Sequence, residues 1–308
     1  MSTGNKKYLI CIVGPTAIGK TTLSIALAKY FNTEIISADS RQFYKEMSIG
    51  TAVPSSEELA AVRHHFIQHK SIQDNYNVGA FESDALSILQ TLFQSHDIAI
   101  MVGGSGLYVE AVINGLDVFP EIDPTIRSRL NERLASEGKE LLSLELKQLD
   151  PKAYEQIDSD NPRRIIRALE VCLGTGKPYS SFLKKSSVIR PFETILIGLD
   201  ADRPTIYERI EQRVDLMIND GLVEEARHLM DERHLNALNT VGYKELFQYF
   251  DNTWTLEFAI SEIKKNTRRF AKRQLTWFKK NKAIHWFNFQ TPTSEIIKLI
   301  AEKIKKSA

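Results

Sequence analysis

The stretch G-P-T-A-I-G-K-T at Gly14–Thr21 directly follows the apolar run Leu9–Val13 and directly precedes a helical pattern at Thr22–Ala28. It is a complete G-x-x-x-x-G-K-[ST] phosphate loop in the strand–loop–helix context that the motif requires. The alternative, a glycine-rich turn that only joins a strand to a helix, does not call for a lysine and a hydroxyl residue after the second glycine. The sequence therefore predicts a site for a polyphosphate, as in nucleotide- and ATP-binding proteins.

The chemistry of this loop depends on four of its residues. Gly14 and Gly19 allow backbone angles that turn successive N–H groups inward around an anion. The start of the following helix adds a partial positive charge. Lys20 supplies a mobile ammonium group, and the Thr21 hydroxyl is suited to hold a Mg²⁺ ion.

Composition sets broad limits. The chain has 308 residues, enough for one large domain or two, with 43% hydrophobic residues and a net charge of +1. Only local patches could therefore indicate nucleic acid. Cys11 and Cys172 lie in apolar stretches without metal-ligand spacing, so we expect buried thiols in a reducing compartment. No apolar run reaches the roughly 18 residues of a membrane span and no signal-peptide core is visible, so we expect a cytoplasmic protein.

Apolar strands alternate with helical patterns in the first third of the chain. We expect strands at Leu9–Val13, Glu34–Ala38 and Asp97–Val102, and a fourth at Thr194–Leu199. Such alternation predicts a parallel α/β sheet with right-handed crossovers. Together with the phosphate loop, it indicates a P-loop NTPase-like core.

The region between the third and fourth strands lacks strand alternation. We expect a mostly helical insertion at residues 115–194, with 1–114 and 195–308 forming the core. The helices expected in this region and after it lie around 123–149, 151–157, 162–173, 205–219 and 223–233.

Asp39 ends the second strand. Ligands of parallel sheets bind at the carboxyl ends of strands, so Asp39 should lie beside the phosphate loop. It could hold Mg²⁺ through water, act as a general base, or only cap the next helix. The polar residues Ser40, Arg41 and Gln42 follow at once, which suits a substrate-facing loop better than a simple cap.

The third strand ends in glycines, at Gly103-Gly104-Ser105-Gly106, where nucleotide hydrolases carry an acid. These glycines would allow close approach to a bulky planar or apolar ligand. The missing acid disfavours an ATP-hydrolysing motor.

Two clusters of cations have competing interpretations. Arg209 and Arg213 are spaced i, i+4 on one helix face, and could clamp a diphosphate or pair with nearby acids in solvent. The segment Lys264–Lys282 holds nine Lys or Arg and no acid, with aromatic residues interleaved. It suits a phosphate backbone with stacked bases better than a solvated face over an apolar stripe. The histidines at 64, 65 and 69 do not suggest a metal site.

Further segments complete a pattern that spans nearly the whole chain. They resemble the bacterial-type tRNA dimethylallyltransferases, also called tRNA isopentenyltransferases. Two distant cysteines do not supply the zinc finger of the eukaryotic relatives. Departures from the family pattern stand at Ile18 and Ser105, and in one loop region at Ser48, Val53, Arg63 and Gln68. The matching blocks are G-P-T-A-I-G-K-T at 14–21, I-S-A-D-S-R-Q-F-Y at 36–44, S-I-G-T-A-V-P at 48–54, R-H-H-F-I at 63–67, G-G-S-G-L-Y at 103–108, N-P-R-R-I-I-R-A-L-E at 161–170, V-G-Y-K-E at 241–245 and T-R-R-F-A-K-R-Q-L-T-W at 267–277.

The resemblance implies transfer of a dimethylallyl group from dimethylallyl diphosphate to the exocyclic amine of the adenosine just 3′ of a tRNA anticodon. It implies that Asp39 is the base, that Arg213 assists the leaving phosphates and that Thr21 holds Mg²⁺. The implied diphosphate-binding residues are Gly14, Pro15, Thr16, Ala17, Ile18, Gly19, Lys20 and Thr21. Those expected to touch the anticodon stem-loop are Asp39, Ser40, Arg41, Gln42, Ser105, Arg127, Arg163, Arg164, Lys272, Arg273 and Gln274.

Two other functions remain open at this stage. An enzyme that prenylates free adenine nucleotides would not need the basic helix or the arginine-rich insertion. A small-molecule kinase would need a lid with catalytic arginines and no RNA surface. We expect a monomer that contacts no membrane.

Overall fold

The computed structural model describes residues 6–158, 160–183 and 188–307. The chain forms two compact units, one made of Met1–Asn114 with Ile189–Ala308 and the other of Gly115–Val188. The return to the larger unit lies a few residues before the expected position 195. Arg190 explains this, because its guanidinium already pairs with Glu82 and donates to the Ala111 carbonyl of the larger unit.

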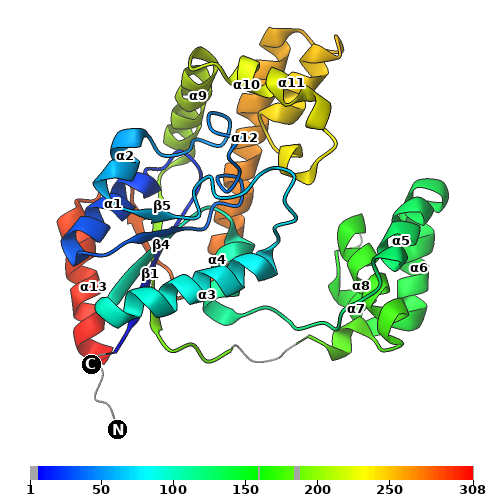
Figure 1. Cartoon of the computed structure of the whole chain (residues 1–308), viewed down its shortest axis with the longest axis horizontal. Coiled ribbons are helices and arrows are strands. Elements are labelled where there is room, and N and C mark those ends of the chain that lie inside the picture. Colours follow the sequence, from blue (N-terminus) through cyan, green and yellow to red (C-terminus); the bar gives the residue numbers. More distant parts are fainter. Residues whose placement is uncertain (1–5, 159, 184–187, 308) are drawn as a thin grey trace. The chain divides into compact units, whose positions relative to one another are not determined.

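A six-stranded sheet, parallel throughout, forms the centre of the larger unit (Figure 1), as the sequence predicts. The strand order is β3-β2-β4-β1-β5-β6. The two outermost strands were not predicted, and the other four fall within one residue of their expected ends. The strands are β1 (Tyr8–Val13), β2 (Ile35–Ser37), β3 (His64–His65), β4 (Ile98–Val102), β5 (Glu193–Asp200) and β6 (His285–Asn288).

Helices cover both faces of this sheet, because the side chains of β1 alternate between two apolar cores. Ile10 and Ile12 belong to the core that includes α1, α9 and α13, whereas Leu9 and Cys11 belong to the core with α3 and α4. Cys11 is a free, fully buried thiol whose pKa is raised by burial. The helices of the larger unit are α1 (Lys20–Phe31), α2 (Ser56–Ala61), α3 (Val78–Ser95), α4 (Gly106–Asn114), α9 (Arg203–Asn219), α10 (Leu222–His228), α11 (Tyr243–Phe250), α12 (Leu256–Phe278) and α13 (Thr293–Ser307), with short 3₁₀ turns at Met230–Glu232 and Asn236–Leu238.

The local signals explain most helix ends. Asp202 caps α9 by accepting the N–H of Thr205, with Pro204 in the first turn. The helix expected at 223–233 is shorter, because α10 ends at His228 and a 3₁₀ turn follows. Within the described residues, no helix is both long and apolar enough to cross a membrane.

The smaller unit is helical, as predicted, and has its own core. The long helix expected at 123–149 is two helices, since Gly138 adopts a φ of +83° between them. The core includes Leu142 and Leu146 from one helix and Ile165 and Leu169 from another. The helices are α5 (Pro124–Glu137), α6 (Lys139–Leu149), α7 (Pro151–Gln156) and α8 (Pro162–Thr175), followed by a 3₁₀ turn at Tyr179–Ser181.

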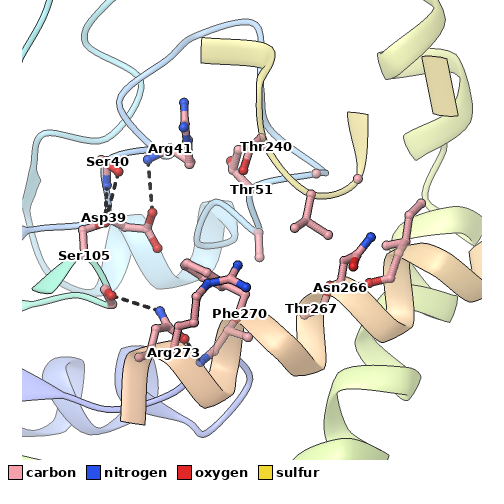
Figure 2. Close-up of a pocket in the computed structure, with 18 of the residues that line it drawn as sticks. Asp39, Ser40, Arg41, Thr51, Ser105, Thr240, Asn266, Thr267, Phe270 and Arg273 are labelled. Atoms are coloured by element: carbon pink, nitrogen blue, oxygen red, sulfur yellow. Dashed lines mark hydrogen bonds between the residues drawn. The ribbon is translucent and has the colours of Figure 1, made fainter. Parts of the chain in front are cut away.

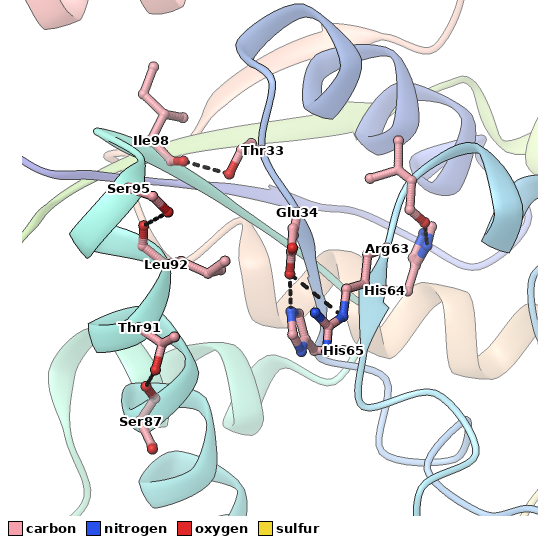
Figure 3. A network of polar contacts seen from close by, with 11 residues as sticks. Thr33, Glu34, Arg63, His64, His65, Ser87, Thr91, Leu92, Ser95 and Ile98 are labelled. Carbon is pink, nitrogen blue, oxygen red and sulfur yellow. Dashed lines mark hydrogen bonds and ion pairs between the residues drawn. The ribbon is translucent and has the colours of Figure 1, made fainter.

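The paired histidines serve the edge of the sheet. Glu34, just before β2, contacts the His65 Nε2 atom of β3 and lies 3.8 Å from the Arg63 Nε atom (Figure 3). The His64 Nδ1 atom contacts the Val62 carbonyl at 2.8 Å. The described residues contain no cluster of three or more His, Cys, Asp or Glu that could hold a metal.

His69 lies in an aromatic cage. The rings of Phe43, Phe66 and Tyr76 meet it edge-on, with centroids 5.2–5.4 Å away. Neither ring nitrogen of His69 has a hydrogen-bond partner in the described structure. Burial, with a further contribution from Lys70, lowers the pKa of His69 to about 4, so the imidazole is neutral in the folded protein.

This cage predicts acid sensitivity. An unfolded histidine binds a proton below about pH 6.5, whereas folded His69 resists protonation down to about pH 4. The contribution of neutral His69 to folding stability is therefore fully present above about pH 6.5. It decreases by about 1.4 kcal/mol for each pH unit as the pH falls from about 6.5 to about 4. The free energy of unfolding of His69→Phe should therefore fall less on acidification than that of the wild type. Urea unfolding of both proteins at about pH 7 and pH 5 measures these changes, and an equal fall in both proteins would refute the prediction.

Candidate active site

The phosphate loop has the backbone of an anion-binding nest. Gly14, Ala17 and Gly19 all have positive φ, at 145°, 64° and 100°. A Cβ on Gly14 would lie 2.4 Å from the Leu199 carbonyl oxygen of β5, so only glycine fits there. The Lys20 Nζ atom donates to the Pro15 carbonyl at 2.7 Å, which keeps the ammonium folded over the loop.

Arg209 and Arg213 face the phosphate loop and the cavity beside it. The Arg209 Nε atom donates to the Ala17 carbonyl at 2.7 Å, and its guanidinium lies over the Phe289 ring. Arg213 lines the cavity wall. The acids of α9 that could have neutralised them in solvent bond elsewhere: Glu208 to Gln212, Glu211 to Arg268 and Asp215 to Lys264. The alternative of a solvated charged face is thus wrong for this pair.

Asp39 follows β2 and is half-buried in the same wall. No helix begins there, since α2 starts only at Ser56, so the capping interpretation is wrong. The Arg41 N–H instead donates to the Asp39 Oδ1 atom at 3.1 Å. Burial raises the pKa of Asp39, and this hydrogen bond together with the charges of Lys20, Arg41 and Arg213 limits the rise.

The charges of this group affect one another. The pKa of Lys20 is lowered to about 8. Burial is the largest cause of this shift, Asp39 opposes it and Arg213 adds to it. Burial and then Arg209 lower the pKa of Arg213. The Asp39 carboxylate and the cations Lys20 and Arg213 therefore share one largely buried site.

The residues after Asp39 join it to neighbouring loops. Ser40 contacts Ser105, through its N–H at 3.0 Å and its hydroxyl at 3.1 Å. The Arg41 guanidinium donates to the Asn236 and Ala237 carbonyls, at 3.0 and 2.9 Å. These contacts assemble the wall around Asp39 and engage three of the residues expected to contact tRNA.

Gln274 is buried and lines the cavity beside Asp39. It is only 5% exposed, its Oε1 atom accepts the Thr16 N–H at 2.8 Å, and its Nε2 atom donates to the Gly104 carbonyl at 3.0 Å. A Cβ on Gly104 would lie 2.2 Å from that Nε2 atom. The absence of a side chain at Gly104 therefore makes room for Gln274 of α12. The sequence predicted instead that these glycines let a ligand approach the backbone.

A cavity of about 670 Å³ is enclosed by these elements (Figure 2). Asp39, Ser105 and Arg273 line it together with Phe270 of α12. Residues that the sequence analysis did not single out also line it, namely Thr51, Asn239, Thr240, Asn266 and Thr267. Asn266, Phe270 and Arg273 recur at helical spacing on α12, a signal that was available in the sequence.

The basic segment of α12 divides into paired and exposed cations. Lys264, Lys265, Arg268 and Lys279 each form an ion pair with an acid. Lys272 and Arg273 are exposed and form no ion pair among the described residues, and the Arg273 guanidinium lies over the Phe270 ring.

The smaller unit presents its own arginines. Arg163 and Arg164 are exposed at the start of α8. Arg127 is half exposed and donates to buried Glu170, which Arg167 also contacts. Part of the Arg127 side chain is therefore committed to the unit's own structure.

Two of the departures from the family pattern, Ser48 and Gln68, contact each other. The Gln68 Nε2 atom donates to the Ser48 hydroxyl at 2.6 Å and to the Lys45 carbonyl at 3.1 Å. Arg63 pairs loosely with Glu34, and Val53 lines a smaller hollow next to Arg213. The loop that contains Ser48 therefore stays well defined.

The phosphate loop and the parallel sheet define this chain as a protein with a P-loop NTPase-like fold. Residues 42–281 match the IPP transferase family. The chain is 61% identical to the tRNA dimethylallyltransferase of Christiangramia forsetii, over 96% of this chain and 98% of the relative. The chain belongs to the IPP transferase family.

Solved structures agree with this assignment. The tRNA isopentenylpyrophosphate transferase of Bacillus halodurans is similar with a TM-score of 0.74 and 38% identity, over 98% of each chain. A eukaryotic dimethylallyltransferase, described as acting on tRNA, is similar with a TM-score of 0.78 and 26% identity, over 92% of this chain and 74% of that one.

The lowered pKa of Lys20 predicts pH-dependent anion binding. The ammonium is charged below its pKa of about 8, so affinity for pyrophosphate should be highest below pH 8 and fall by up to about tenfold per pH unit above it. Lys20→Arg keeps the charge and should remove this alkaline decline. Calorimetric titration from about pH 7 to about pH 10 compares the two, and an equal decline in both would exclude Lys20 as its source.

Proposed function

We propose that this chain transfers a dimethylallyl group from dimethylallyl diphosphate to the exocyclic amine of the adenosine 3′ of the anticodon in tRNA. Membership of the family supports the reaction class and the RNA substrate. The observation that carries the site is that Thr16 of the phosphate loop and Asp39 line one cavity, which Phe270 and Arg273 of α12 also line.

The reaction is a substitution at the first carbon of the dimethylallyl group. The amine nitrogen forms a bond to this carbon while the bond from the carbon to the diphosphate oxygen breaks. The nitrogen gives up a proton, and the bonding electrons leave with the diphosphate. An adenine amine is a weak nucleophile, so both a base and stabilisation of the leaving group are required.

The residues divide these tasks. Asp39 accepts the amine proton, because its raised pKa makes it a stronger base than an ordinary aspartate. The phosphate loop binds the diphosphate with its N–H groups and Lys20. Arg213 stabilises the charge on the leaving oxygens. Arg209 acts indirectly, by holding the loop at Ala17.

A Mg²⁺ ion fits this chemistry. The Thr21 hydroxyl follows Lys20 in the first turn of α1, and Mg²⁺ favours one or two protein oxygens together with substrate phosphates. We propose that Thr21 holds the ion, which would neutralise diphosphate charge when bound.

tRNA binding requires more than the cavity. The adenosine has to leave its stack to reach Asp39, and Phe270 offers an aromatic face at the cavity wall. Lys272 and Arg273 of α12, and Arg163 and Arg164 of α8, are exposed cations suited to phosphates of the anticodon stem-loop. We propose that the protein acts as a monomer.

One assay tests the proposal against its rivals. The protein is incubated with radiolabelled dimethylallyl diphosphate and either unmodified tRNA or AMP, and separately with labelled ATP and AMP as phosphate acceptor. Label in tRNA alone supports the proposal. Label in AMP would indicate a free-nucleotide prenyltransferase, and phosphate transfer would indicate a kinase.

The base role of Asp39 predicts a specific loss. Asp39→Asn keeps the size of the side chain and an acceptor for the Arg41 N–H, but cannot take up a proton. The kcat should fall by about 10²–10⁴-fold, with pyrophosphate affinity little changed. Asp39 accepts a proton only when it is ionised, so the rate of the wild type should fall at low pH. The midpoint of this fall should lie above the ordinary pKa of an aspartate, and the fall should be absent in the variant. A normal kcat rejects the role, and a large loss of Mg²⁺ affinity would assign the carboxylate to the metal instead.

The exposed cations predict changes in salt dependence. Lys272→Ala/Arg273→Ala and Arg163→Ala/Arg164→Ala should each flatten the plot of log Kd for tRNA against log salt. Each lost phosphate contact removes roughly 0.7–0.9 from the slope. Lys305→Ala/Lys306→Ala, two exposed lysines on α13, is the matched control. Identical slopes in all variants would mean that these charges face solvent in the complex.

A further inference from the structure

A carboxylate from α10 holds the loop at Ser48–Ala52. The Glu225 Oε2 atom accepts the N–H groups of Ser48 and Ile49, at 2.9 and 2.8 Å. Its Oε1 atom accepts the Gly50 N–H at 2.9 Å and the Tyr243 hydroxyl at 2.6 Å. Three successive N–H groups that converge on one point are an arrangement that binds anions, and here the anion belongs to the protein.

The ring of Tyr243 packs against the same loop at Gly50. Its side chain is fully buried, and a Cβ on Gly50 would lie 2.7 Å from its ring. Burial, with Glu225 next in effect, raises the pKa of Tyr243, so the hydroxyl remains a donor. The loop is therefore confined by both a carboxylate and a ring.

The loop at Ser48–Ala52 is connected to Asp39 through Gln42. The Gln42 Nε2 atom donates to the Thr51 and Ala52 carbonyls at 3.2 and 2.8 Å, and the Gln42 N–H donates to the Asp39 carbonyl at 3.1 Å. Thr51 and Ala52 themselves line the cavity, together with Asp39. These contacts join the loop at Ser48–Ala52 to the backbone of Asp39 through Gln42 alone.

We propose that Glu225 is a positioning residue for the transfer reaction. It fixes the Gly50–Ala52 wall, and through Gln42 it fixes the backbone that carries Asp39, so that the base meets the amine in a reactive geometry. This inference rests on the proposed function. Its physical basis is that a displacement of about 1 Å between base and nucleophile is enough to lower a rate by roughly 100-fold.

Glu225→Gln is the sharpest variant, because it keeps the shape and replaces one accepting oxygen by an NH₂ group that faces backbone N–H groups. The kcat for tRNA should fall by about 10–100-fold, while the Kd for pyrophosphate should change by less than about twofold. Tyr243→Phe removes one of the four hydrogen bonds and should have a smaller effect. Glu224→Gln, the exposed neighbour on the same helix, is the control and should leave both constants unchanged.

Hydrogen exchange separates positioning from general damage. Hydrogen exchange of the Ser48–Gly50 amides should become faster in Glu225→Gln, with the exchange of β1 unchanged. The inference is overturned if these amides exchange faster while kcat stays normal, or if pyrophosphate affinity falls as much as kcat. If the wild-type protein transfers no label to tRNA, the proposed function fails first, and the exchange data still report whether Glu225 holds the loop.

Discussion

The carboxamide of Gln274 connects three parts of the chain that are far apart in sequence. From near the carboxyl end of α12, it accepts a hydrogen bond from Thr16 in the phosphate loop and donates one to Gly104 in the loop after β4. Only a side chain with both a donor and an acceptor at this reach could do so. Since the amide is buried, either unmet contact would be costly, on the order of 1–3 kcal/mol. The cavity beside Asp39 thus depends on α12 lying across the carboxyl edge of the sheet.

The charges around the cavity would make the binding of a diphosphate and the proton affinity of Asp39 depend on each other. Lys20 and Arg213 both stabilise the ionised form of Asp39, and burial opposes them. A bound diphosphate would offset these cations, which would raise the pKa of Lys20 and of Asp39 together. The aspartate would therefore become a better proton acceptor when the donor is in place. With RNA but no diphosphate in the cavity, Lys20 and Arg213 would keep the pKa of Asp39 lower, so Asp39 would be a weaker proton acceptor.

The sequence allowed the fold class, the insertion and the phosphate loop to be predicted, because each has a strong local pattern. β3 and β6 were missed, since β3 has two residues and β6 presents a half-buried face without clear alternation. The contact of Gln274 with tRNA was expected from the family resemblance and stays a prediction. Its burial was not expected, although its spacing from Ala271 and Phe278 places it on their buried face.

Glu225 was missed for a similar reason. It follows an exposed glutamate, and pairs of adjacent acids usually lie in solvent. Its spacing from Leu222 and Leu229 matches the buried side of α10, so the helical period carried the information. The partners of Glu225 are backbone N–H groups, which have no signature in a sequence. Contacts of this kind become visible only with the fold.

The pairing of Ser48 with Gln68 has a consequence for how this chain tolerates change. Gln68 is held at a φ of +48°, and its amide group joins the Ser48 hydroxyl to the Lys45 carbonyl. Exchange of Gln68 for an apolar residue would remove this donor to the Ser48 hydroxyl, whereas exchange of Ser48 would leave Gln68 bonded to the Lys45 carbonyl. Because the two side chains are in contact, the effects of exchanging them on stability should not be additive. In a consensus design or a reconstructed ancestor, any residue placed at position 48 is best tolerated if it can still accept a hydrogen bond from Gln68.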